Sequence, residues 1–376
     1  MTPATEAELA GMVATADGPL RIQGGGTRDI GAPVAGDVLS TAALSGIVDY
    51  EPGALTLVAR AGTPVAEIET VLAAEGQRLA FEPMDHRVLL GTTGVPTIGG
   101  VVATNASGPR RVAAGACRDF LLGVRFVDGT GRVLKNGGRV MKNVTGYDLV
   151  KLMAGSWGTL GVMSEVSFKV LPAPPARAVL LLYGLTEHDA VKAMTRALAS
   201  PFEVTGASHY PVGLDGDPAT VLRIEGFAQS VAYRARRLAD LLADFGMAQI
   251  ETDPEKTAQG WQWVRDVVPF QTAEGDVWRF SVKPTDAPEL VRGLRSRGVS
   301  QVLYDWGGGL IWVLCQPGAD LRPETFDGHA TLVRSNLETR RKIPVFQPEP
   351  APLATISKGL RAKFDPKGIL NPGLMG

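Results

Sequence analysis

Apolar and polar positions in the first 172 residues recur with two different periods, which predict short helices and strands in alternation. Apolar residues at helical spacing predict helices over residues 6–16 and 64–75. In the second of these helices we expect Thr63 to be the N-cap and Pro64 to occupy the first helical position. Gly76 follows the last apolar residue of that pattern and is expected to end the helix.

Apolar runs and period-two patterns predict strands in the same half at residues 20–23, 55–60, 121–127, 132–134 and 162–170. The third and fourth of these flank Asp128-Gly129-Thr130-Gly131, which is typical of a hairpin turn. Residues 162–170 alternate in a way that predicts a half-buried strand. Residues 147–154 indicate a short helix, and residues 81–108 are rich in small residues and proline and are expected to be loop.

Pro172-Ala173-Pro174-Pro175 marks the strongest domain boundary, because consecutive prolines cannot join a sheet interior. Beyond it, strands are predicted at residues 179–185, 202–210, 220–227, 247–251, 277–283, 301–306, 310–315 and 343–347. Helices are predicted at residues 187–199, 229–245, 286–297 and near 329–341. This order forms two successive β-α-β-β-α-β units, which favours an antiparallel sheet with helices on one side and an α+β fold class.

Composition excludes several classes of function. Hydrophobic residues make up 45% and charged residues 20% of the chain, which is typical of a globular protein, and the net charge of −1 disfavours nucleic-acid binding. The two cysteines, Cys117 and Cys315, form no C-x-x-C, so this chain alone supplies no iron–sulfur or structural zinc site. The N-terminus lacks a basic segment and no apolar run reaches membrane-spanning length, so we expect a cytoplasmic location.

Glycine is enriched, with 45 residues gathered in clusters near positions 24–26, 91–100, 155–161 and 307–309. Neither G-x-G-x-x-G after a strand nor a Gly-Lys phosphate loop is present, which removes the main support for a nicotinamide or ATP site. Three glycines after a strand can instead turn successive N–H groups toward one anion, and Arg28 adds a phosphate-binding guanidinium. Any single cluster is equally compatible with a tight turn.

The sequences of these loops, and their order along the chain, resemble those of a known family. GGGTR, GTTGVPTIGGVVATNASGPRR, RDFLLGVRFVDGTGRVL and KNVTGYDLVKLMAGSWGTLGVMSEVSFKVLP resemble the FAD domain of vanillyl-alcohol-oxidase-type (PCMH-type) flavoproteins. FDPKGILNPGLMG resembles the closing motif of FAD-linked 2-hydroxy-acid oxidases, and with YDWGGGLIWVL the chain looks most like the E subunits of bacterial glycolate oxidases. The resemblance implies a PCMH-type domain of two α+β subdomains over residues 1–172, an α+β cap domain over 176–347, and a tail, 348–376, that returns to the FAD domain.

The resemblance also implies which residues bind FAD. The loop that holds the pyrophosphate would be Gly24, Gly25, Gly26, Thr27 and Arg28. The pyrophosphate and isoalloxazine side would be lined by Thr97, Ile98, Gly99, Gly100, Asn105 and Gly108. The adenine end or ribityl chain would be approached by Gly158, Gly161 and Val162.

Three departures from the family pattern shape the expected chemistry. The first glycine loop holds no histidine and no cysteine lies near Val95-Pro96, so FAD is expected to be non-covalent. The H-x-G-D-G-N-x-H motif of catalytic relatives is absent, and His86, His188, His209 and His329 have no metal-ligand spacing. Leu374 stands where the family often has lysine.

Three functions remain open. The leading hypothesis is an FAD-binding subunit of a glycolate or D-lactate dehydrogenase, paired with a related catalytic FAD subunit and an iron–sulfur subunit. Such a complex would use an acceptor other than NAD and could meet the inner membrane through its partners. The alternatives are a self-sufficient FAD-dependent 2-hydroxy-acid dehydrogenase, with Arg28, Arg110 or Arg111 as the carboxylate partner, and a non-catalytic scaffold of the same fold.

Overall fold

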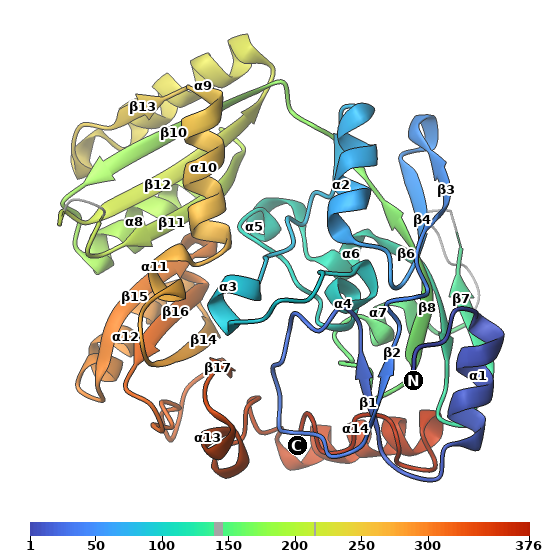
Figure 1. Cartoon of the computed structure of the whole chain (residues 1–376). Helices are drawn as coiled ribbons and strands as arrows, with labels where there is room; N and C mark the ends of the chain where they lie inside the picture. The colour runs from blue at the N-terminus through green and yellow to red at the C-terminus, as the bar shows by residue number, and fades with distance from the viewer. Residues whose placement is uncertain (139–145, 214–215) are drawn as a thin grey trace. The chain divides into compact units, whose positions relative to one another are not determined.

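The structure, a computed structural model, describes residues 1–138, 146–213 and 216–376, which fold into two compact units (Figure 1). Unit 1 comprises Met1–Ser107, Ala116–Ala173 and Pro348–Gly376, and unit 2 comprises Gly108–Gly115 and Pro174–Gln347. The chain therefore passes between the units at four places. None of the helices in these ranges is long and apolar enough to cross a lipid bilayer.

Unit 1 is built on a five-stranded antiparallel sheet with the order β3-β4-β8-β6-β7. Its strands are β1 (Leu20–Gln23), β2 (Asp37–Ser40), β3 (Ile47–Glu51), β4 (Thr56–Arg60), β5 (Gln77–Arg78), β6 (Leu121–Val127), β7 (Val133–Gly137), β8 (Val162–Lys169) and β9 (Leu171–Pro172). Its helices are α1 (Glu6–Thr15), α2 (Val65–Ala74), α3 (Arg87–Leu90), α4 (Ile98–Ala103), α6 (Cys117–Phe120), α7 (Leu149–Met153) and α14 (Ala351–Phe364), with a 3-10 turn at η1 (Pro52–Ala54). Strands β1 and β2 form a separate parallel pair, and β5 pairs with β9.

The predicted hairpin is confirmed, whereas β8 is buried more completely than predicted. Strands β6 and β7 pair antiparallel, and the Asp128 carboxylate accepts hydrogen bonds from the N–H groups of Thr130 and Arg132 in the turn between them. Strand β8 lies between β4 and β6, so Met163 and Ser167 are buried as well as the apolar face. A central strand loses its solvent face, which its alternating sequence does not reveal.

The start of α2 differs from its prediction. Pro64, not Thr63, occupies the N-cap position, and its side chain makes no capping hydrogen bond. The Thr63 hydroxyl instead donates to the Arg60 carbonyl at 2.7 Å and accepts from Gly46 N–H at 3.0 Å. Gly76 follows the helix with a φ of +61°, as expected for a terminating glycine. The expected loop over residues 81–108 is also partly wrong, since it contains the short helices α3 and α4.

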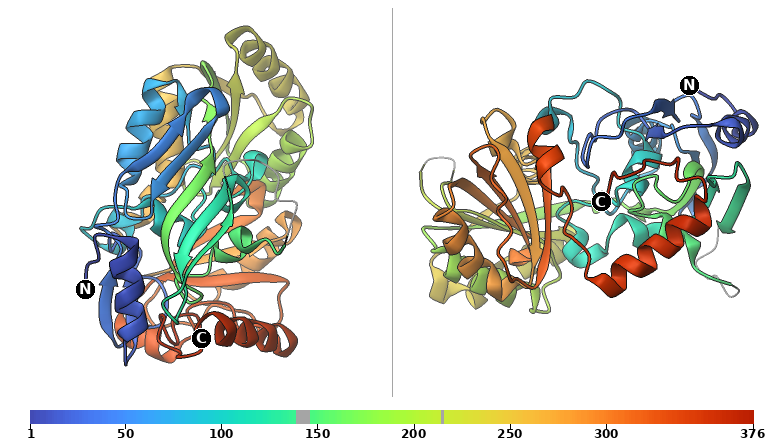
Figure 2. Two further views of the ribbon diagram at one scale, coloured as in Figure 1. Left: turned by 90° about the vertical axis from the view of Figure 1, so that its right-hand side faces the viewer. Right: turned by 90° about the horizontal axis from the view of Figure 1, so that it is seen from below.

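A hydrophobic core joins distant parts of unit 1. Leu9 and Val13 of α1 pack with Leu20 of β1 and with Ile369 and Leu370 near the C-terminus. Figure 2 shows α1 and α14 at the periphery of this unit. The C-terminal segment therefore packs directly beside the strand that leads into the first glycine loop.

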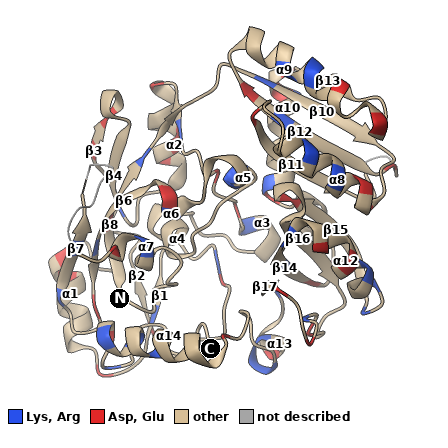
Figure 3. Cartoon of the chain, turned by 180° about the vertical axis from the view of Figure 1, so that it is seen from behind, with Lys and Arg blue, Asp and Glu red and all other residues tan. Residues whose placement is uncertain are grey.

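Unit 2 is built on an eight-stranded antiparallel sheet with the order β13-β10-β12-β11-β15-β16-β14-β17. Its strands are β10 (Ala176–Tyr183), β11 (Val204–Tyr210), β12 (Ala219–Gly226), β13 (Gln249–Glu251), β14 (Asp276–Val282), β15 (Val299–Asp305), β16 (Leu310–Cys315) and β17 (Gly328–Arg334). Its helices are α5 (Arg111–Ala114), α8 (Glu187–Leu198), α9 (Ala228–Leu241), α10 (Pro254–Arg265), α11 (Val268–Gln271), α12 (Ala287–Arg295) and α13 (Leu337–Lys342), with 3-10 turns at η2 (Ala243–Phe245), η3 (Pro284–Asp286) and η4 (Trp306–Gly308). Acidic and basic residues are interspersed along α8, α9 and α12 (Figure 3).

The first β-α-β-β-α-β repeat of unit 2 is confirmed, but the end of the second is wrong. The helix predicted near 329–341 is divided into strand β17 and helix α13, and the strand predicted at 343–347 is irregular. His329, Ala330 and Leu332 pair with β14, so sheet pairing overrides the local helical pattern. Helix α10, which the sequence reading missed, packs Trp261 and Val264 against Val179 of β10.

Candidate functional site

The first wall of the candidate site is the loop that follows β1. Strand β1 pairs with β2, and the Gly24 carbonyl accepts a hydrogen bond from the Ser40 hydroxyl at 3.3 Å. In the part of the chain that the structure describes, the N–H groups of residues 24–28 donate no hydrogen bond. Because backbone N–H groups in folded proteins are nearly always paired, five consecutive unpaired donors indicate a place for an anion or water.

The second wall is the backbone around residues 94–100, which touches the first loop. A Cβ atom on Gly25 would lie 1.6 Å from the Val95 carbonyl oxygen, and one on Gly94 would lie 1.7 Å from the Gly25 carbonyl oxygen. Both positions must therefore be glycine for the two loops to pack. Thr97 is the N-cap of α4, where its hydroxyl accepts from Gly100 N–H at 3.4 Å.

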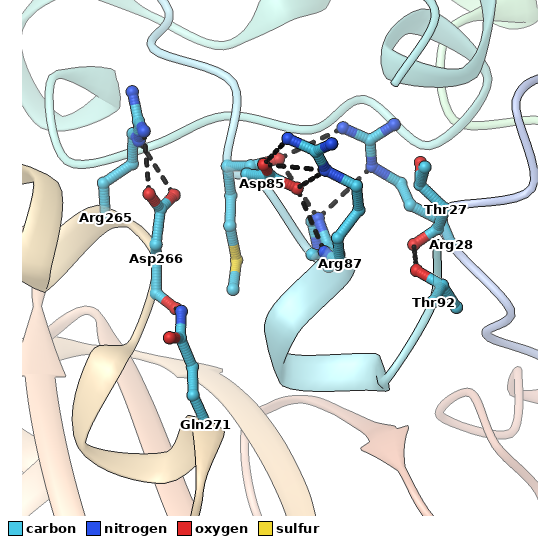
Figure 4. A network of polar contacts seen from close by, with 10 residues as sticks. Thr27, Arg28, Asp85, Arg87, Thr92, Arg265, Asp266 and Gln271 are labelled. Carbon is cyan, nitrogen blue, oxygen red and sulfur yellow. Dashed lines mark hydrogen bonds and ion pairs between the residues drawn. The ribbon is translucent and has the colours of Figure 1, made fainter. Parts of the chain in front are cut away.

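Arg28 places a positive charge beside these loops. Its Nε donates to His86 Nδ1 at 3.3 Å and its terminal nitrogen donates to the Met84 carbonyl at 3.1 Å. Figure 4 shows Arg28 beside Asp85 and Arg87, and the Thr92 hydroxyl donating to the Thr27 carbonyl. Loss of hydration lowers the pKa of Arg28 to about 10 and Asp85 opposes that shift, so the guanidinium remains charged at neutral pH.

The third wall joins residues 157–162 to the C-terminal segment through Asn371. The Asn371 side chain accepts from Ile22 N–H at 2.8 Å and donates to the Trp157 carbonyl at 2.7 Å. Its own N–H donates to the Leu20 carbonyl at 3.0 Å. One side chain thus fixes β1 and the Trp157 loop with respect to each other.

These three walls enclose one open pocket. Predicted site residues that line it are Gly24, Gly25, Gly26, Thr27, Arg28, Gly99, Gly100, Gly158, Gly161 and Val162. Residues that the sequence reading did not assign but that also line it include Arg21, Gln23, Thr41, Ala61, Thr104, Trp157, Asn371 and Leu374. Asn371 and Leu374 lie in the closing motif FDPKGILNPGLMG, which could have indicated that they belong to the site. Thr41 and Ala61 lie in no motif, so nothing in the sequence indicated them.

Four predicted site residues lie outside the pocket lining. Thr97 caps α4, and Ile98 is fully buried in the core. The Asn105 side chain accepts from Arg118 N–H at 3.0 Å. Gly108 belongs to unit 2, where its carbonyl accepts from the Trp306 indole at 3.1 Å. Residues 142–145 of the KNVTGYD motif lie outside the described residues.

Leu374 fills its position by packing. A Cβ atom on Gly31 would meet the Leu374 side chain at 2.6 Å, and the Leu374 carbonyl accepts from Ala32 N–H at 3.0 Å. This leucine therefore closes one side of the pocket with apolar surface, where a lysine would have brought a charge.

The pocket fits FAD by the chemistry of its lining. Five unpaired N–H groups and the Arg28 guanidinium suit a pyrophosphate. Gly100 leaves the space above α4 open, since a Cβ atom there would meet only the Thr97 hydroxyl at 3.3 Å and Arg28 at 3.5 Å. Trp157, Ile22 and Val162 add apolar surface of the kind that flat ring systems contact.

Among the residues that the structure describes, no histidine lines the candidate pocket. His209 is 1% exposed within the sheet, where its Nδ1 lies 2.9 Å from the Thr220 hydroxyl and burial lowers its pKa to about 4. His188 on α8 and His329 on β17 are exposed. Elsewhere in the described ranges, no group of three or more His, Cys, Asp or Glu side chains could hold a metal ion.

Acidification is expected to destabilise unit 2 through His209. Its folded pKa of about 4 lies below the unfolded value of about 6.5, so the unfolded chain takes up the proton first and stability falls as pH drops from 6.5 toward 4. The expected loss is up to about 3 kcal/mol, measured by urea unfolding between pH 7 and 4. His209→Phe should flatten this slope and His329→Gln should keep it. Equal slopes in all three proteins would contradict the assignment.

Unit 2 also gathers cations around Trp306. The Arg111 guanidinium lies 4.7 Å and that of Arg279 lies 5.2 Å from the indole centroid. Within the described residues, the Arg279 side chain makes no hydrogen bond or ion pair, and its Nε is buried. Burial and the neighbouring Arg111 lower the pKa of Arg279 to about 10, which leaves it charged at pH 7. Arg110 is not available in the same way, because it binds Glu225.

Comparisons with known proteins give the family. Residues 1–137 match the family model of the FAD binding domain. The chain is 36% identical over 363 residues to glycolate oxidase subunit GlcE of Escherichia coli (strain K12), covering 95% of this chain and 92% of that protein. It is 26% identical over 407 residues to glycolate oxidase subunit GlcD of Bacillus subtilis (strain 168), covering 95% and 83%.

Solved structures of low identity show the same fold. p-Cresol methylhydroxylase with substrate bound has a TM-score of 0.70 at 15% identity, covering all of this chain and 88% of that chain. Alkyldihydroxyacetonephosphate synthase has a TM-score of 0.69 at 18% identity, covering 99% and 76%. The predicted α+β, PCMH-type fold class is confirmed. The chain belongs to the family of FAD-binding E subunits of glycolate oxidase.

Proposed function

We propose that this chain is the FAD-binding subunit of a multi-subunit 2-hydroxy-acid dehydrogenase that acts on glycolate or D-lactate. The observation that carries the proposal is the run of five unpaired N–H groups in residues 24–28, set beside Arg28 and opposite Gly99 and Gly100. These groups would hold the pyrophosphate of FAD, and FAD when bound supplies an acceptor for two electrons. The scaffold alternative loses support, because a pocket without a cofactor would have no use for unpaired donors.

FAD in this pocket is proposed to be non-covalent. Cys117 is fully buried, burial raises the pKa of its thiol, and it does not line the pocket. A neutral, enclosed thiol is a poor nucleophile for a flavin ring. His86, the histidine nearest Arg28, accepts a hydrogen bond from Arg28 through Nδ1 and also stays outside the lining.

Dependence on partner subunits is proposed because this chain lacks the histidine motif of catalytic relatives. Oxidation of a 2-hydroxy acid needs a base that takes the hydroxyl proton. His209 is enclosed within the sheet, so a substrate hydroxyl cannot reach it. A related catalytic FAD subunit would supply that base, and an iron–sulfur subunit would carry electrons to an acceptor other than NAD. The names of the relatives, glycolate oxidase subunits GlcE and GlcD, support such an assembly.

Spectroscopy of the purified chain tests this proposal. We expect a flavin spectrum that persists after anaerobic addition of glycolate or D-lactate and bleaches only when the partner subunits are added. A colourless protein that takes up no FAD would contradict the cofactor assignment. Bleaching of the isolated chain would contradict dependence and favour the alternative of a self-sufficient dehydrogenase.

The self-sufficient alternative has one observation in its favour. Arg279 is a half-buried guanidinium whose side chain makes no ion pair with any described residue, and it could hold a substrate carboxylate. If the isolated chain bleaches, Arg279→Leu should abolish the bleaching while FAD content stays unchanged. Bleaching that survives in that variant would exclude Arg279 as the carboxylate partner.

Gly100→Leu is expected to lower FAD affinity at least about tenfold without unfolding the protein. The new side chain would enter the space between Thr97 and Arg28, where the first added carbon would lie 3.5 Å from Arg28, an ordinary distance, and 3.3 Å from the Thr97 hydroxyl, a tight one that a small shift of that side chain would relieve. Gly25 is a poorer test site, because any side chain there strikes the Val95 carbonyl and disrupts the loops themselves. FAD titration of the refolded apoprotein measures the effect.

Gly359→Leu is the matched control for this titration. Gly359 also lies in a helix, α14, and a Cβ atom there meets nothing within 4 Å. It should bind FAD as the parent does. Parent-like affinity in Gly100→Leu would show that the cofactor lies elsewhere.

A further inference from the structure

One face of the unit 2 sheet is only partly covered. Alternate residues of a strand point to the same face, so Val179, Leu181 and Tyr183 of β10 share a side. Helix α10 covers the Val179 end of this face through Trp261 and Val264. Figure 1 shows α10 crossing in front of these strands near one end and leaving the other end open.

A pocket of about 650 Å³ lies over the open part, which is within the range of about 300–1,000 Å³ usual for small-molecule sites. Its floor is apolar, formed by Leu181 of β10 with Ala219 and Val221 of β12. These residues lie on paired strands, with Leu181 opposite Val221 and Tyr183 opposite Ala219. The paired strands therefore offer a continuous apolar surface to a ligand.

Aromatic side chains form the walls of this pocket. Tyr210 and Trp263 meet edge to face, with ring centroids 5.2 Å apart and planes at 73°. The Tyr210 hydroxyl donates to Gln301 at 3.3 Å, which holds that ring in place. Tyr183 is 47% exposed at the rim, a large exposure for an aromatic residue with no assigned role.

The charges at the rim select against anions. Lys256 lies 3.6 Å from Glu251 and is neutralised by it, and Asp217 adds a second carboxylate, so the lining carries one more negative than positive charge. A 2-hydroxy acid, which is an anion with little apolar surface, does not match this pocket. An aromatic molecule without negative charge matches both its floor and its rim.

We propose that this pocket, lined by Leu181, Tyr183, Tyr210, Ala219, Val221 and Trp263, binds a planar aromatic molecule that carries no negative charge. The site lies wholly in unit 2 and does not rest on the proposed FAD chemistry. Its ligand would contact the sheet with one ring face and the aromatic walls with its edges.

The test uses the FAD-loaded protein and a matched pair of probes, 2-naphthol and 2-naphthoate, which share a ring system and differ in charge at neutral pH. Calorimetry and ligand-observed NMR should show saturable binding of 2-naphthol and binding of 2-naphthoate at least about tenfold weaker. Tyr183→Ala should lower the affinity for 2-naphthol about fivefold or more. Ala219→Phe should abolish binding, because its ring would occupy the floor.

Tyr233→Ala is the control, since Tyr233 is 58% exposed on α9 and does not line the pocket. It should bind 2-naphthol as the parent does. The proposal is overturned if 2-naphthol shows no saturable binding, if both pocket variants bind it as the parent does, or if 2-naphthoate binds equally well. It is also overturned if light scattering finds that the parent self-associates through this face and Ala219→Phe does not, because the occupant would then be a second copy of the chain.

Discussion

Replacing Glu225 with glutamine is expected to lower the free energy of unfolding of unit 2 by about 3–5 kcal/mol. The Glu225 carboxylate is buried and accepts from Arg110 Nε at 2.7 Å and from Arg177 Nε at 3.2 Å. Arg223, fully buried, lies 3.7 Å away. Glutamine keeps the shape but removes the charge, so the guanidinium groups of Arg110 and Arg177 would lose the carboxylate that they bind.

Urea unfolding followed by tryptophan fluorescence measures this effect, because Trp261, Trp263, Trp278, Trp306 and Trp312 all belong to unit 2. Glu289→Gln is the matched control. Glu289 pairs with Arg292 on the surface, with side chains 68% and 78% exposed, so its loss should cost less than about 1 kcal/mol. A similar small cost for both variants would show that the buried cluster contributes no more than a surface pair.

The cluster also explains how residues 108–115 come to lie in unit 2. Arg110 binds Glu225, and the Gly108 carbonyl accepts a hydrogen bond from the Trp306 indole, so the first residues of this short segment are held. Limited proteolysis gives a second readout for the Glu225→Gln variant, in which we expect faster cleavage after Arg110 or Arg111. The surface control should be cleaved at the parent rate.

Asn371→Ala is the second change with a large expected effect, a loss of about 3 kcal/mol in stability and at least about tenfold in FAD affinity. The side chain is 4% exposed, and its removal takes away the acceptor for the Ile22 N–H and a donor to the Trp157 carbonyl. Asn371 also has a φ of +45°, a conformation that asparagine tolerates better than alanine. Because β1 leads into residues 24–28, loosening it disorders the N–H groups proposed to bind the pyrophosphate.

Thermal unfolding and FAD titration together test this role. Asn371→Asp should restore little of the stability or of the FAD affinity. Aspartate keeps the hydrogen bond from Ile22 N–H but turns a negative oxygen toward the Trp157 carbonyl. Asn336→Ala is the control, because Asn336 caps α13 through Thr339 N–H and should cost about 1 kcal/mol without changing FAD affinity. Unchanged FAD affinity in Asn371→Ala would contradict a positioning role.

Local patterns in the sequence predicted most elements, and failures follow from long-range contacts. The β6–β7 hairpin was predictable because its turn residues carry their own hydrogen bonds. Residues 328–334 have a helical pattern but form β17, because β14 offers a free edge that only the complete sheet reveals. Thr63 resembles an N-cap, yet its hydroxyl binds Gly46 and Arg60.

The candidate site shows the same division. The glycine loop at residues 24–28 was recognisable because its glycines are consecutive, and Gly99 and Gly100 were recognisable within a motif. The sequence does not show why residue 25 must be glycine. The space for a side chain there is taken by the Val95 carbonyl, which is 70 positions away in sequence. Asn371 lies further still, and only the folded chain brings it to β1.

The contact between Asn371 and β1 has a consequence for biosynthesis. Ile22 and Asn371 are 349 positions apart, so at about 5–20 residues per second a ribosome needs roughly 20–70 s to supply the partner of β1. During that interval the nascent glycine loop lacks the side chain that anchors it. Cofactor capture is therefore expected to be post-translational, and chains terminated early would emerge without a competent pocket.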